Sequence, residues 1–168
     1  IYKFSDIVRS VKWMCYHSLV YKTKILQENK ITIDENCFYV DNEYAIYPLP
    51  FINTVLIFSD PIYCYRIGVE EQSISATSRM KHIKDSEIVS FHVLESVTSL
   101  TDTLDTALLN YLYWNTSRIC GWHFCSLLYF APDNDKRSEI KSFDERISRT
   151  NKQIYEGMLL YFKETKLS

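Results

Sequence analysis

The residue types best suited to chemistry gather in one short segment, residues 120–125, with the sequence CGWHFC. Two thiols and an imidazole could hold a metal ion or form a nucleophile and its base. On a β-strand, however, His123 and Cys125 share one face while Cys120 points to the other, so three ligands cannot converge. The apolar neighbours would also raise the pKa of a thiol and leave little reactive thiolate. We therefore expect no metal ligands and no catalytic residues here. A small thiol-dependent enzyme that uses these side chains remains our second alternative for the function.

Other motifs that carry chemistry are missing from the sequence. The chain has three glycines, Gly68, Gly121 and Gly157, which lie too far apart to form a phosphate-binding loop or a nucleophile elbow. Asp133 and Asp135 resemble the start of a calcium loop, but the positions that follow lack its Asp, Asn and Gly residues. The sequence therefore predicts no cofactor and no small-molecule substrate.

Basic residues concentrate at both ends of an otherwise acidic chain. Residues 1–30 hold six basic and two acidic groups, and residues 136–168 hold eight basic and five acidic groups, although the net charge is −2. Two basic helices lying side by side could form a positive stripe that contacts phosphates. A nucleic-acid-associated protein is thus our first alternative, with these candidate contact residues: Lys12, Lys22, Lys24, Arg146, Arg149 and Lys152.

Aromatic residues are abundant, with 13 Tyr, 9 Phe and 3 Trp in 168 residues. Tyrosine and tryptophan are enriched at protein interfaces, where a few of them supply most of the binding energy. The last predicted helix, residues 137–163, carries an apolar stripe that could pack on a partner. These residues are the expected partner-binding set: Ile140, Phe143, Ile147, Ile154, Tyr155, Met158 and Tyr161.

The elements that must position these residues follow from the hydrophobic periodicity. Residues 5–28 repeat apolar positions at three- and four-residue steps, which predicts an N-terminal helix. Residues 31–69 alternate in steps of two and contain turn residues, which predicts a four-stranded antiparallel meander whose third strand, residues 52–58, is central. Residues 70–86 are polar, and we expect a mobile loop there.

The second half of the chain is expected to add strands and helices to this sheet. Residues 87–94 alternate again and predict a fifth strand, and residues 99–114 carry a helical stripe. Residues 119–130 form a dense apolar run that we interpret as a strand, with a buried helix as the alternative.

The predicted fold is therefore a single α+β domain over residues 1–168. An antiparallel sheet of five or six strands would carry the N-terminal helix and the two later helices, mostly on one face. The sequence has no apolar run long enough to cross a membrane, and its five cysteines lack the spacing of a disulfide framework. The resulting hypothesis is a non-catalytic subunit or adaptor, located in the cytoplasm or nucleus, that binds another protein subunit.

Overall fold

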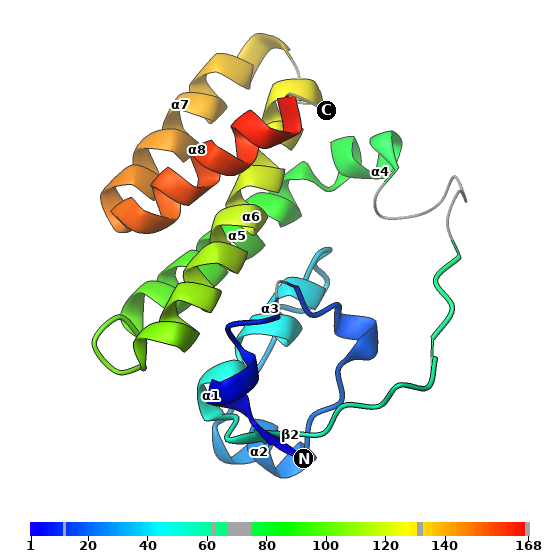
Figure 1. The fold of residues 1–168 in the computed structure, drawn as a ribbon. Helices are drawn as coiled ribbons and strands as arrows, with labels where there is room; N and C mark the ends of the chain where they lie inside the picture. The colour runs from blue at the N-terminus through cyan, green and yellow to red at the C-terminus, as the bar shows by residue number, and fades with distance from the viewer. Residues whose placement is uncertain (12, 62, 67–74, 131–132, 167–168) are drawn as a thin grey trace.

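The second half of the chain folds into a bundle of long helices. The computed structural model describes residues 1–11, 13–61, 63–66, 75–130 and 133–166. Helices α5 (Ile83–Ser99) and α6 (Thr106–Phe130) run side by side through the middle of the molecule, and helices α7 (Asp133–Thr150) and α8 (Lys152–Lys166) form a hairpin beside them (Figure 1). Helix α6 is central, because it contacts α5, α7, α8 and the short helix α4 (Ala76–Lys81).

The first third of the chain lies on the opposite side of the α5–α6 pair from the α7–α8 hairpin (Figure 1). It consists of short elements joined by turns, and helix α3 makes its main contact with α5. Between α2 and α3, three residues, Lys30, Asn36 and Tyr39, adopt positive φ angles of 51°, 53° and 70°. These left-handed backbone conformations interrupt regular helix or strand there. Its elements are β1 (Tyr2–Lys3), α1 (Phe4–Ile7), η1 (Tyr16–Ser18), α2 (Thr23–Glu28), α3 (Asp41–Ile46), η2 (Leu49–Phe51) and β2 (Thr54–Val55).

The predicted α+β fold is therefore wrong, because the described part of the chain is mostly helical. Its only sheet pairs β1 with β2 antiparallel over two residues each, with Tyr2 opposite Val55. The predicted meander is replaced by short helices and turns, and the predicted N-terminal helix over residues 5–28 is divided into α1, η1 and α2. Of the expected loop 70–86, residues 70–74 lie outside the described residues, and the rest forms α4 and the first turn of α5.

Residues 87–94 and 119–130, which we predicted as strands, are helical. The prediction is wrong because buried polar residues interrupt the apolar pattern that would indicate a helix. In α5, the buried positions Ser86, Ser90 and Val97 complete a helical face that apolar alternation alone does not reveal. In α6, Ser126 is buried yet donates a hydrogen bond to the Trp122 carbonyl, four residues earlier, at 2.9 Å. Such bonds let a helix bury polar groups without leaving donors unpaired. The alternative that we left open for residues 119–130, a buried helix, is the correct one.

The predicted helix 137–163 is two helices, because Asn151 ends one and begins the next. The Asn151 backbone N–H donates to the Ile147 carbonyl at 3.0 Å, which completes α7. Its side-chain Oδ1 then accepts from the backbone N–H groups of Gln153 and Ile154, both at 3.1 Å, as an N-cap does. The chain thereby reverses, and α8 returns along α6 and α7 (Figure 1).

Candidate functional site

The expected partner-binding stripe is used inside the molecule. Phe143, Ile147, Ile154 and Met158 are fully buried in the core that α7 and α8 form with α5 and α6. Ile140, Tyr155 and Tyr161 are half-buried. The four buried side chains thus stabilise the bundle and are not accessible to a partner.

The candidate nucleic-acid residues fall on separate parts of the molecule. Lys22 and Lys24 lie beside or in α2, in the first third of the chain, whereas Arg146 and Arg149 lie in α7 across the α5–α6 pair (Figure 1). Lys12 lies outside the described residues. The two basic helices are therefore not side by side.

Most of these basic side chains have a carboxylate partner. Arg146 reaches Glu95 at 2.7 Å, and the other three pairs are Lys24 with Glu28 at 3.5 Å, Arg149 with Glu145 at 3.4 Å and Lys152 with Glu156 at 3.8 Å. Carboxylates beside each cation weaken the attraction for phosphate, so these residues make no continuous positive stripe.

The thiol and imidazole groups of segment 120–125 are buried in α6. Burial raises the pKa of the Cys120 thiol to about 12 and lowers the pKa of His123 to about 3. The His123 Nδ1 faces the Ser86 hydroxyl at 2.9 Å and its ring packs on Phe143. At neutral pH such a pair offers neither a thiolate nor a proton acceptor of useful strength.

A groove of about 640 Å³ lies between the first third of the chain and helices α5, α6 and α8. Aromatic rings form much of its lining: Trp13, Tyr16, Tyr39, Tyr65, Trp122 and Tyr161. Two guanidinium groups pack on this wall, Arg79 over Trp122 at 4.3 Å and Arg118 over Tyr161 at 5.1 Å. The groove is large enough for an apolar side chain, and two of its rings, Trp122 and Tyr161, already have cationic partners.

A second feature is the exposed segment, residues 54–58, which comprises the two-residue strand β2 and the three residues after it, which are not in a strand. Leu56, Ile57 and Phe58 are 57%, 59% and 68% exposed, and they follow one another in the chain. Among the described residues, nothing forms a backbone hydrogen bond with these three. We predicted a central strand here, and the segment instead lies at an open edge.

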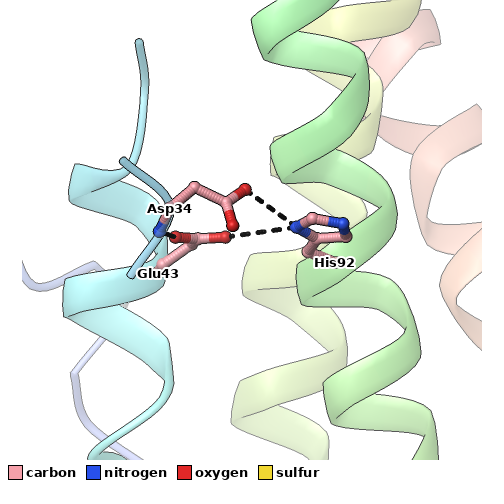
Figure 2. A group of neighbouring side chains, drawn as sticks. All are labelled: Asp34, Glu43 and His92. Carbon is pink, nitrogen blue, oxygen red and sulfur yellow. Dashed lines mark hydrogen bonds and ion pairs between the residues drawn. The ribbon is translucent and has the colours of Figure 1, made fainter. Parts of the chain in front are cut away.

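The third feature brings together three possible metal ligands that are far apart in the sequence. Asp34 comes from the turn before α3, Glu43 from α3 and His92 from α5, and their side chains converge between the two helices (Figure 2). His92 Nδ1 lies 2.8 Å from an Asp34 oxygen and 3.8 Å from a Glu43 oxygen. Sequence reasoning missed this cluster, because no regular spacing connects a residue in a turn with residues of two different helices.

Comparisons with protein-family models, with curated proteins and with solved structures give no match for this chain. A search of the described residues for a helix long and apolar enough to span a lipid bilayer finds none.

Proposed function

We propose that this chain is a non-catalytic protein-interaction domain, a subunit or adaptor that binds a partner protein at the exposed segment, residues 54–58. The observation that carries this proposal is the run of three exposed apolar side chains whose backbone pairs with no strand among the described residues. Extended edges of this kind pair readily with another strand.

The energetics favour covering this segment. Burying a Leu, Ile or Phe side chain completely is worth about 1.5–3 kcal/mol. Because roughly 60% of each of the three side chains remains exposed, covering Leu56, Ile57 and Phe58 would contribute about 3–5 kcal/mol. A bound strand would also pair with the free N–H and C=O groups, as in other complexes formed by strand addition.

The partner would add a strand to the edge of β2 that faces away from β1. Among the described residues β1 is the only strand beside β2, so the sheet ends there. The strand β2 ends at Val55, and the partner strand would extend the pairing over Leu56, Ile57 and Phe58, all of which are exposed. A partner strand with apolar residues on both faces would fit this edge best.

The same structure gives less support to the alternatives. The candidate phosphate-binding side chains are dispersed and mostly paired with carboxylates. The buried Cys120 and His123 have pKa values that disfavour thiol catalysis. All five cysteines are free thiols, which supports an intracellular location where thiols stay reduced.

The test compares two aspartate variants with equal starting exposure. Ile57 and Leu160 are both 59% exposed, but Leu160 lies on α8, far from the proposed edge (Figure 1). Purified wild-type, Ile57→Asp and Leu160→Asp proteins are used as baits in an extract of the native cells, with quantitative mass spectrometry. We expect a specific protein that wild type and Leu160→Asp recover equally and that Ile57→Asp recovers at least tenfold less.

Both variants should keep the wild-type melting temperature, since exposed substitutions usually change stability by less than about 0.5 kcal/mol. Equal recovery of every captured protein by Ile57→Asp and wild type would show that residues 54–58 are not the binding surface.

A further inference from the structure

The cluster of Asp34, Glu43 and His92 brings two carboxylates together without a permanent cation. Glu43 is only 1% exposed. Among the described residues neither carboxylate forms an ion pair with a lysine or arginine, and His92 is their one basic partner. Buried charged groups in proteins are paired with an opposite charge or coordinate a metal ion, so the buried Glu43 carboxylate beside Asp34 favours a cation between them.

The three donor atoms have the spacing that a small metal ion needs. The oxygen and nitrogen atoms all lie within 4.8 Å of one another, one from each residue. Zinc bonds to nitrogen and oxygen are about 2.0–2.2 Å long, so two ligand atoms at the tetrahedral angle are about 3.4 Å apart. The distances of 2.8 Å and 3.8 Å from His92 Nδ1 to the two oxygens bracket that value.

Other hydrogen bonds already hold the Glu43 carboxylate in position. Its Oε2 accepts from the Asp34 backbone N–H at 2.8 Å, and its Oε1 accepts from the Tyr47 hydroxyl at 3.1 Å. Each carboxylate oxygen has two lone pairs, so Oε1 keeps one for a metal ion. Hydrogen bonds that orient the ligands in this way are typical of metal sites in proteins.

We propose that Asp34, Glu43 and His92 bind one first-row divalent cation, Zn²⁺ or a similar ion, with water completing its coordination. One imidazole and two carboxylates form a ligand set that zinc accepts, whereas Mg²⁺ and Ca²⁺ prefer oxygen alone. The ion neutralises the two carboxylates and joins α3 and the turn before it to α5 (Figure 2). The site is separate from residues 54–58 and does not depend on the proposed strand addition.

The experiment titrates metal-free protein with Zn²⁺ and follows the heat of binding. We expect one site in the wild type that His92→Gln weakens by more than about 100-fold, because losing a hydrogen bond to a ligand alone costs 10–100-fold. Asp34→Asn should weaken the same site to a similar degree, and Tyr47→Phe should weaken it 10–100-fold. Equal melting temperatures of the metal-free proteins would show that these variants fold.

The matched control is His82→Gln. His82 Nδ1 lies 2.9 Å from Asp85 Oδ2, almost the geometry of the His92–Asp34 pair, but that pair belongs to no cluster of three ligands among the described residues. This variant should bind Zn²⁺ as the wild type does.

Cobalt provides a check on the ligand types. With Co²⁺ in place of Zn²⁺, the nitrogen and oxygen ligands give no sulfur-to-metal charge-transfer band. Such a band would overturn the assignment, since it would place a thiolate such as Cys37 in the site. The proposal would also be overturned if wild type bound no Zn²⁺ below about 1 mM, if His92→Gln bound it unchanged, or if Ca²⁺ competed equally.

Discussion

Replacing Gly157 with alanine should destabilise the protein, although alanine is the better helix former. Gly157 lies in α8 opposite Ser117 of α6, where the two helices approach closely. A Cβ atom at position 157 would overlap the Ser117 hydroxyl and lie 2.8 Å from its Cβ. The hydroxyl cannot move freely, because it donates to the Tyr113 carbonyl at 2.8 Å or the Ile154 carbonyl at 3.0 Å.

The expected magnitude follows from two opposing contributions. An alanine in place of a helical glycine adds about 0.5–1 kcal/mol of stability through backbone entropy. Adding a methyl group to a tightly packed site costs about 1–3 kcal/mol, and contact with the backbone-anchored Ser117 favours the upper half of that range. The net effect of Gly157→Ala should therefore be a loss of about 1–2 kcal/mol in the free energy of unfolding.

Urea denaturation monitored by circular dichroism measures this loss. Gln153→Ala, on the exposed face of the same helix, is the control and should stay within about 0.5 kcal/mol of wild type. The double variant Ser117→Gly with Gly157→Ala removes the obstructing side chain, so Gly157→Ala should be better tolerated in the Ser117→Gly background than in wild type. A Gly157→Ala protein as stable as the wild type, or more stable, would refute the close contact between α6 and α8.

Two further predictions concern the core. Ile147→Asp should cost several kcal/mol of stability or prevent folding, because it places a charge in a fully buried site; unchanged thermal melting would remove Ile147 from the core. Because the pKa of His123 falls to about 3, the unfolded chain takes up this proton below about pH 6.5 while the folded chain does not. Stability therefore falls as the pH drops from 6.5 towards 3, and this group contributes up to about 2 kcal/mol of the loss down to pH 5. In urea denaturation, the free energy of unfolding of His123→Asn should fall between pH 7 and pH 5 by up to about 2 kcal/mol less than that of the wild type. Identical losses in the two proteins would contradict a buried neutral imidazole.

The sequence predicted helices with one polar, exposed side better than it predicted helices that are buried on several sides. The apolar stripe of residues 137–163 correctly predicted helix, although the sequence did not reveal that Asn151 divides it. Helices α5 and α6 were missed as full helices because they are buried on several sides. Apolar residues then no longer follow the helical period, and buried side chains such as Ser90 and Ser126 resemble the polar positions of a strand.

The candidate sites were harder to predict than the helices. We predicted a central strand over residues 52–58 from their apolar character, but the structure has a strand only at Thr54–Val55, in a two-stranded sheet. Only the structure shows that the strand beside it is two residues long and that Leu56 to Phe58 remain exposed. The Asp34, Glu43 and His92 cluster depends on where α3 packs against α5, which no local pattern encodes.

Hydrogen exchange across residues 54–58, in the free chain and in its purified complex, tests the proposed function most directly. Backbone amides of Leu56, Ile57 and Phe58 have no hydrogen-bond acceptor within the described structure, so they should exchange rapidly in the free protein. Strand addition predicts that exchange across the segment slows at least tenfold in the complex. Unchanged exchange there, with protection appearing at another surface, would contradict the proposal that this edge binds the partner.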